Sequence, residues 1–142
     1  MNFLQGNETI GGEMDMFKTL LVEDNTAFRQ SLTEIMRAQF PLIAVEEAAD
    51  ADEALQKVDA FLPNLIFMDI KLPNGNGLEL TKKIKKEHPE MNIIILTSYD
   101  FLEYRQAATQ YGANHFLSKA SVTREEIAAL VKSFFEKENA AQ

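Results

Sequence analysis

Apolar residues along the chain gather in short runs that are separated by segments about one helix long. The five runs are FKTLLV at 17–22, LIAVEEA at 42–48, NLIFMD at 64–69, MNIIILT at 91–97 and NHFLS at 114–118. Near-continuous runs of this length, bounded by turn residues, are typical of strands buried on both faces of a sheet. The sequence therefore predicts five strands.

The segments between the runs show the three-to-four-residue apolar spacing of amphipathic helices. The clearest sets are Phe28, Leu32, Ile35 and Met36; then Ala51, Ala54, Leu55 and Val58; then Ile127, Leu130, Val131 and Phe134. Less regular patterns after Gly77 and after Asp100 predict two more helices. Five strands are thus expected to alternate with five helices.

Some helix ends can also be predicted from single residues. Asp50 with Glu53 and Thr123 with Glu126 have capping-box spacing, and Gly112 is a C-cap signal. Strands that alternate with helices form parallel sheets covered on both faces. We therefore expect an α/β fold: a doubly wound, five-stranded parallel sheet in three αβα layers, with the common strand order 2-1-3-4-5.

The length of 142 residues suits a single domain. Residues 1–15 carry neither period and hold three of the six glycines, so we expect a flexible N-terminal extension at 1–15. The domain is expected at 16–138, followed by a C-terminal tail at 139–142.

Charge and composition exclude several classes of function. With 14 Lys and Arg against 22 Asp and Glu, the net charge is −8, which argues against direct binding of nucleic acid. No apolar run approaches the ~20 residues of a membrane span, so we expect a cytoplasmic protein without membrane contact. The chain has no Cys, which excludes disulfides and thiolate metal sites.

Polar side chains stand where four of the predicted strands end. They are Glu23 and Asp24 after the first, Asp69 after the third, Thr97 after the fourth and Lys119 after the fifth. Because parallel strands point the same way, all five residues lie at the carboxyl edge of the sheet, where doubly wound folds bind ligands. The first and third strands are neighbours in the expected order, so the three carboxylates should converge.

Converging carboxylates repel one another unless a cation lies between them. An all-oxygen set without a nearby His or Cys favours a hard ion such as Mg²⁺. Lys119 adds a fixed positive charge and Thr97 a hydroxyl. A metal, a lysine and a carboxylate nucleophile are the parts that phosphoryl transfer requires.

These residues resemble the response-regulator receiver domain of two-component signalling, of the CheY-like superfamily, which has the flavodoxin-like fold. The resemblance covers about residues 17–137 and rests on the five strand-end residues in order. It also rests on DIKLPNGNGL at 69–78 and YGANHFLSK at 111–119. Ala120 stands where the family usually has proline, which is similar to receivers of the nitrate-regulator (NarL/LuxR-like) subfamily.

The resemblance implies that Asp69 accepts a phosphoryl group from a phosphohistidine of a sensor histidine kinase. The domain, although not a conventional enzyme, would itself catalyse this transfer and the later hydrolysis. Mg²⁺ would bind Asp24, Asp69 and the backbone carbonyl of Lys71, with Glu23 acting through water, and Lys119 would hold a phosphoryl oxygen.

The resemblance also implies a switch. Thr97 would move to bond the phosphoryl group, and Phe116 would turn inward to fill the space. The surface of the fourth helix, fifth strand and fifth helix would then change and bind a downstream partner or a fused output domain. A homodimer is also possible, through that surface or through the first and fifth helices.

The chain departs from the commonest family pattern in three respects. Ala120 leaves the Lys119–Ala120 peptide either cis, at a cost of ~3 to 4 kcal/mol, or trans. Glu23 replaces the usual Asp and lengthens one arm of the acidic pair. Lys71 and Tyr99 lie two residues past Asp69 and Thr97, where the family tunes phosphate lifetime, and we expect these bulky side chains to lengthen it.

Two classes of function remain. The first is a phosphorylation-driven switch, and the alternative is a phosphorylation-independent protein-interaction module on the same fold. A flavin carrier is disfavoured because no Ser/Thr/Gly-rich loop follows the first strand. A haloacid-dehalogenase phosphatase would need a second Asp where this chain has Lys71.

Overall fold

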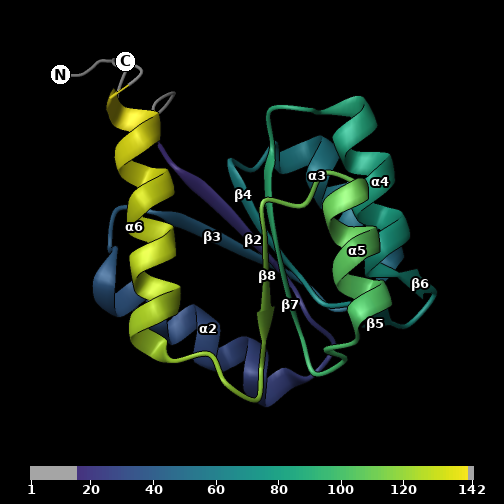
Figure 1. Ribbon diagram of the computed structural model, residues 1–142. Helices are drawn as coiled ribbons and strands as arrows, with labels where there is room; N and C mark the ends of the chain where they lie inside the picture. Colours follow the sequence, from purple (N-terminus) through teal and green to yellow (C-terminus); the bar gives the residue numbers. More distant parts are fainter. Residues whose placement is uncertain (1–15, 141–142) are drawn as a thin grey trace, which may run out of the picture.

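A five-stranded parallel sheet forms the centre of the computed structural model, which describes residues 16–140 (Figure 1). Its strands are β2 (Lys18–Val22), β3 (Ala44–Ala48), β4 (Leu65–Met68), β7 (Asn92–Thr97) and β8 (His115–Ser118). They lie in the order β3-β2-β4-β7-β8, with every neighbouring pair parallel. This confirms the predicted order 2-1-3-4-5.

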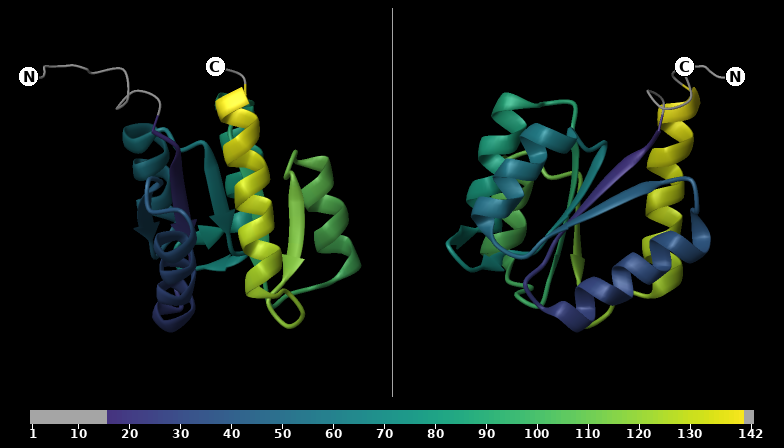
Figure 2. Two further views of the ribbon diagram at one scale, coloured as in Figure 1. Left: turned by 90° about the vertical axis from the view of Figure 1, so that its left-hand side faces the viewer. Right: turned by 180° about the vertical axis from the view of Figure 1, so that it is seen from behind.

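Five helices cover the two faces of the sheet, as predicted. They are α2 (Thr26–Gln39), α3 (Ala51–Phe61), α4 (Gly77–Glu87), α5 (Leu102–Gln110) and α6 (Arg124–Ala140). Helices α2 and α6 pack on one face, and α3, α4 and α5 on the other (Figure 2). None of the helices within residues 16–140 is both long and apolar enough to cross a membrane.

The ends of the predicted domain are only partly described. The expected extension at 1–15 lies outside the described residues, as do residues 141 and 142 of the expected tail. Helix α6 continues to Ala140, two residues beyond the end expected at 138.

Successive side chains along each strand point to opposite faces of the sheet and pack into two separate hydrophobic cores. In β2, Leu20 and Val22 belong to the core under α3, α4 and α5, whereas Leu21 belongs to the core under α2 and α6. The three helices with a clear apolar spacing bury most of the predicted stripe, for example Leu32, Ile35 and Met36 of α2, whereas α5 buries only Ala108. Burial on both faces explains why the strands are continuously apolar.

The predicted helix caps form. The Asp50 Oδ1 accepts from the Glu53 backbone N–H at 2.8 Å, and Thr123 and Glu126 bond each other's backbone N–H groups at 2.8 and 3.0 Å. Gly112 has φ +97° just past α5, and its N–H donates to the Thr109 carbonyl at 3.1 Å. This is the left-handed conformation that favours glycine after a helix.

A small hairpin between β4 and α4 was not predicted. Strands β5 (Lys71–Leu72) and β6 (Gly75–Asn76) pair in antiparallel fashion. Strands of two residues are too short to show an alternating pattern, so the sequence carried no sign of them. The Asn76 side chain then caps α4 by accepting from the Leu78 N–H at 2.8 Å. The hairpin thereby sets the path of the chain from the end of β4 to the start of α4.

We predict that replacing Thr19 with valine stabilises the protein. The Thr19 hydroxyl on β2 is fully buried and has no hydrogen-bond partner among the described residues. Valine has nearly the same shape and no polar atom, so the free energy of unfolding should rise by about 1 kcal/mol. Urea unfolding of Thr19→Val checks this, with Thr33→Val as the contrast, because the Thr33 hydroxyl donates to Glu47 at 3.1 Å. A fall in stability for Thr19→Val would contradict the prediction.

Candidate functional site

Three carboxylates meet at the carboxyl edge of the sheet, where β2 and β4 end. Strand pairing places Val22 beside Met68, and the Asp69 N–H donates to the Val22 carbonyl at 3.1 Å. Glu23, Asp24 and Asp69 each offer an oxygen within 4.8 Å of the others. The structure thus brings together all three acids that the sequence singles out.

Lys119 joins two of these acids. Its Nζ lies 2.6 Å from Glu23 Oε1 and 3.0 Å from Asp69 Oδ2. The backbone guides it there, because β8 pairs with β7 and the Lys119 N–H donates to the Thr97 carbonyl at 2.9 Å. The Phe28 ring of α2 covers the ammonium, with its centroid 4.5 Å from Nζ. Phe28 therefore adds a cation–π contact to the two ion pairs.

Burial and ion pairing have opposite effects on the pKa values of Glu23 and Lys119. Burial raises the pKa of Glu23, although the hydrogen bonds from Lys119 and from the Asn25 N–H oppose the rise. Burial lowers the pKa of Lys119, but its bonds to Glu23 and Asp69 outweigh this effect, and the net change is upward. Lys119 is therefore a permanent cation at neutral pH.

Asp69 and Asp24 differ in exposure and in partners. Asp69 is buried, its Oδ1 accepts from the Ile70 N–H at 2.7 Å, and its Oδ2 accepts from Lys119. Asp24 is exposed, and its carboxylate forms no hydrogen bond with another described residue. Carboxylate oxygens without a His or Cys ligand fit a hard divalent cation such as Mg²⁺. Glu23, Asp24 and Asp69 could hold one.

Of the two residues that the resemblance assigns to the switch, Thr97 is bonded through its carbonyl to the Lys119 backbone N–H, and Phe116 lies three residues before Lys119. Thr97 is buried at the end of β7, and its hydroxyl accepts from the Tyr99 N–H at 3.2 Å. Phe116 of β8 is half-buried beneath the guanidinium of Arg105, which lies 4.6 Å from the ring centroid. Arg105 is held in turn by Asp100. Both switch candidates are therefore in contact with the loop between β7 and α5 or with α5 itself.

Lys71 and Tyr99 lie against each other, although 28 positions separate them in the sequence. The Lys71 Nζ lies 5.3 Å from the centroid of the Tyr99 ring and 5.8 Å from that of Tyr104. Both Lys71 and Tyr99 are exposed. The two positions expected to affect phosphate lifetime thus form one cation–π unit.

The peptide between Lys119 and Ala120 is trans, as is every other peptide bond in the part of the chain that the structure describes. This decides between the two geometries that the sequence left open. Lys119 reaches both carboxylates with the peptide in this form.

Two residues at the site carried no functional signal in the sequence. Phe28 was expected only as part of the apolar stripe of its helix, and Arg29 was not singled out. Arg29 donates from Nη1 to the Glu23 carbonyl oxygen at 2.7 Å. A basic residue at the start of a helix is unremarkable without the fold, so nothing in the sequence alone could have identified this contact.

Comparison with known proteins shows which family the chain belongs to. Residues 19–132 match the family model of the response regulator receiver domain. The chain belongs to this family. The receiver is 34% identical over 117 residues to the DNA-binding transcriptional activator DevR/DosR of Mycobacterium tuberculosis, covering 82% of this chain and 54% of that protein. It is 36% identical over 103 residues to the oxygen regulatory protein NreC of Staphylococcus haemolyticus, covering 72% and 48%.

The receiver spans about half the length of these curated relatives. Among solved structures, it resembles a CheY-like receiver domain protein of Methanospirillum hungatei, with 31% identity, a TM-score of 0.81 and coverage of 89% of this chain and 99% of that one. It also resembles a LuxR-family response regulator of Aurantimonas, with 26% identity, a TM-score of 0.76 and 86% of each chain covered. These matches confirm the predicted family and its likeness to the NarL/LuxR-like subfamily.

Proposed function

We propose that this receiver accepts a phosphoryl group on Asp69 from a phosphohistidine of a sensor histidine kinase, in a reaction that depends on Mg²⁺. The observation that carries the proposal is the contact of Lys119 with both Glu23 and Asp69 beside the exposed Asp24. This arrangement places a nucleophilic carboxylate, a fixed cation and a set of metal-binding oxygens at one edge of the sheet.

In the proposed reaction, a carboxylate oxygen of Asp69 attacks phosphorus. The new bond is P–O, the P–N bond to the kinase imidazole breaks, and the imidazole nitrogen takes the bonding electron pair and then a proton. Lys119 holds a phosphoryl oxygen as charge shifts between donor and acceptor. Asp24, Asp69 and the Lys71 backbone carbonyl would hold Mg²⁺, with Glu23 acting through water. Bound Mg²⁺ supplies charge neutralisation for the phosphoryl oxygens.

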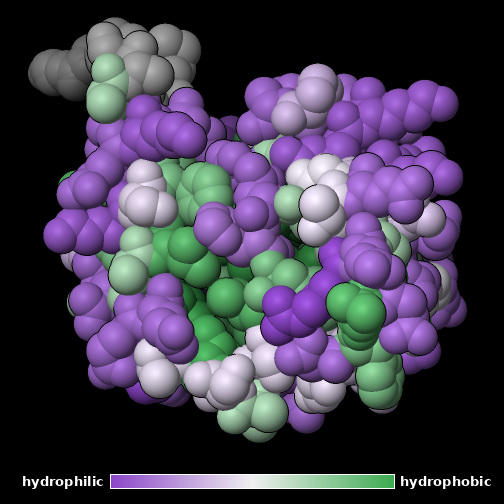
Figure 3. Space-filling view, viewed as in Figure 1, coloured by the Kyte–Doolittle hydropathy of each residue, from purple (hydrophilic) through white to green (hydrophobic). Residues whose placement is uncertain are grey.

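Phosphorylation would then change one surface. Thr97 would exchange its bond with the Tyr99 N–H for one to the phosphoryl group, and Phe116 would turn inward from beneath Arg105. The surface concerned is formed by α5, β8 and α6. Figure 3 shows apolar residues in a hollow on this face, and a groove there is lined by His115 and Phe134. A partner of the pathway would bind here.

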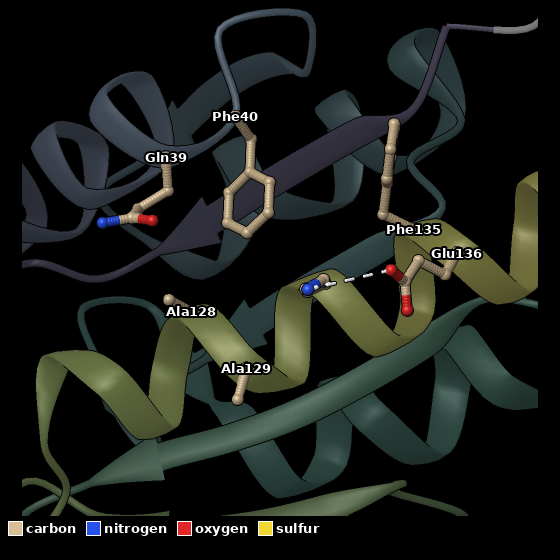
Figure 4. Close-up of a pocket in the computed structure, with 7 residues that line it drawn as sticks. Gln39, Phe40, Ala128, Ala129, Phe135 and Glu136 are labelled. Carbon is tan, nitrogen blue, oxygen red and sulfur yellow. Dashed lines mark ion pairs between the residues drawn. The ribbon is translucent and has the colours of Figure 1, made fainter.

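The proposed partners are a sensor histidine kinase and a downstream protein or fused output domain. The relatives include DNA-binding activators, which agrees with an output domain that contacts DNA while the receiver does not. A homodimer could use the α5–β8–α6 surface or the groove between α2 and α6, where Phe40 faces Ala128 and Phe135 (Figure 4). Dependence on a kinase phosphohistidine agrees with a cytoplasmic location.

The decisive experiment supplies a small phosphoryl donor. With acetyl phosphate and Mg²⁺, the wild-type chain should gain one phosphoryl group by intact mass, and Asp69→Asn should gain none. Beryllofluoride with Mg²⁺ should shift the NMR signals of α5, β8 and α6 in the wild type only. A wild type that folds but is never labelled would instead support the phosphorylation-independent interaction module.

We predict that Lys71→Asn combined with Tyr99→Glu shortens the lifetime of phospho-Asp69. The double change removes the cation–π contact that holds both side chains in place, so water should reach the acyl phosphate more easily. An exposed contact of this kind is worth ~0.5 to 1 kcal/mol, which corresponds to about a twofold to fivefold faster hydrolysis. The decay of the phosphorylated mass after removal of acetyl phosphate measures this rate. An unchanged rate would contradict the prediction.

A further inference from the structure

Arg29 connects the acidic pair of the site to β3. Its side chain is only 16% exposed. The Nη1 donates to the Glu23 carbonyl oxygen at 2.7 Å, and the Nε donates to Glu47 Oε1 at 2.7 Å. The other oxygen of Glu47 accepts from the Thr33 hydroxyl at 3.1 Å. The guanidinium is thus fixed on one side by β3 and α2, and it fixes a backbone carbonyl on the other.

That carbonyl belongs to the peptide unit that joins Glu23 to Asp24, so its orientation affects the two acids differently. The Glu23 side chain is held independently by Lys119 at 2.6 Å and by the Asn25 N–H at 2.9 Å. The Asp24 carboxylate is exposed and forms no hydrogen bond within residues 16–140. Because no hydrogen bond holds the Asp24 side chain, the backbone is what directs it toward the site, and rotation of this peptide would carry Asp24 away from Asp69.

The backbone at this point is held from two directions. The Glu23 N–H donates to the Ala48 carbonyl at the end of β3 at 2.9 Å, which fixes the peptide before Glu23. Arg29 fixes the peptide after it. A planar guanidinium can form both the Glu47 and the Glu23 bonds at once, in a fixed geometry that a lysine ammonium does not reproduce.

We propose that Arg29, oriented by Glu47, is a positioning residue that holds Asp24 where it can bind the divalent cation. The inference rests on the proposed function, since the cation matters here as part of phosphoryl transfer to Asp69. Replacing a residue that orients a metal ligand without touching the metal typically changes the metal affinity by ~10 to 100-fold. Arg29 touches none of the reacting atoms, so its loss should act on cation binding and leave the chemical step almost unchanged.

The test measures the rate of Asp69 phosphorylation by acetyl phosphate as a function of Mg²⁺ concentration. For Arg29→Gln we expect the half-saturating Mg²⁺ concentration to rise at least ~10-fold, with the rate at saturating Mg²⁺ almost unchanged. Glu47→Gln should raise it less, and Arg29→Lys should restore it only in part. Arg37→Gln is the matched control, because Arg37 is exposed in the last turn of the same helix, and it should match the wild type.

Several outcomes would overturn the inference. One is a half-saturating Mg²⁺ concentration for Arg29→Gln equal to that of Arg37→Gln, whatever happens to the melting temperature. Another is a lower rate at saturating Mg²⁺ without a change in half-saturation, because Arg29 would then act on the chemical step. If Arg29→Gln does not fold, Glu47→Gln and Arg29→Lys carry the same comparison.

Failure of the proposed function would look different. In that case the wild type would not be phosphorylated at any Mg²⁺ concentration. Calorimetric titration of Mg²⁺ into the wild type, Arg29→Gln and Arg37→Gln would then test the positioning role alone. Equal affinities, or no binding to any of the three, would overturn it.

Discussion

Lys119→Met should slow the phosphorylation of Asp69 by at least ~100-fold, the usual result of removing one preorganised charge from an active site. The ammonium contacts both Glu23 and Asp69. Methionine keeps most of the apolar stem of the side chain but removes the ammonium, and with it both ion pairs and the cation–π contact with Phe28. The rate of labelling by acetyl phosphate at saturating Mg²⁺ measures the effect. Lys132→Met is the control, since Lys132 is an exposed lysine of α6, and it should leave the rate unchanged.

The same substitution should make the stability of the protein depend on pH in a predictable direction. Burial already raises the pKa of Glu23 above its ordinary value of 4.5, and Lys119 is the main group that opposes the rise. Without the lysine, the native protein binds the Glu23 proton more tightly than the unfolded chain does. Stability relative to the wild type should therefore be nearly normal below pH 4.5 and should fall as the pH rises through the raised native pKa.

At pH 7 and without metal, the loss for Lys119→Met should reach about 3 kcal/mol, as expected when one partner of a buried ion pair is removed. Urea unfolding at several pH values measures it. A constant difference between the variant and the wild type across this pH range would show that the lost contribution is packing and not charge.

Gly77→Ala should destabilise the protein by about 3 kcal/mol, at the upper end of the usual cost of an overpacked site. A Cβ at Gly77 would lie 1.9 Å from the carbonyl oxygen of Asp69 and 2.8 Å from its carbonyl carbon. These are backbone atoms, so no side chain can rotate away. Helix α4 cannot simply retreat either, because the Gly77 N–H donates to the Ile70 carbonyl at 2.7 Å.

The strain from Gly77→Ala would fall on the phosphoacceptor itself. We expect phosphorylation by acetyl phosphate to slow even under conditions where the variant is fully folded, because Asp69 would be displaced from Lys119. Urea unfolding and the labelling rate measure the two effects separately. Glu79→Ala, an exposed change in the first turn of the same helix, is the control and should affect neither. A stable Gly77→Ala with normal labelling would mean that the backbone near Asp69 yields easily.

The sequence predicted best those features that depend on a pattern repeated along the whole chain. Continuous apolar runs identified all five strands, and the polar residues at four of the strand ends needed only the parallel topology to be placed at one edge. Glu23 and Asp69 meet because β2 and β4 pair in register, and this follows from the common strand order. The helix caps at Asp50 and Thr123 were also predictable, because the residues that form them are close in sequence.

Features that depend on the exact path of a side chain were not predictable. The Lys71–Tyr99 contact and the bond from Arg29 to the Glu23 carbonyl each join residues whose distance is set only by the folded structure. The isomer of the Lys119–Ala120 peptide was left open because a non-proline residue at this position does not by itself decide it. The β5–β6 hairpin was missed for a different reason, because its strands have two residues each. Local geometry of this kind can be seen only in the folded structure.

The extra methylene of Glu23 has a consequence for how readily the receiver responds. The longer arm lets the carboxylate reach the Lys119 ammonium at 2.6 Å, closer than Asp69 at 3.0 Å. An incoming phosphoryl group must therefore compete with an internal anion for the same ammonium. We expect this competition to raise the donor concentration at which labelling reaches half its maximal rate, without preventing labelling at saturating acetyl phosphate, so that a docked kinase phosphorylates the receiver far more readily than the same donor group free in solution.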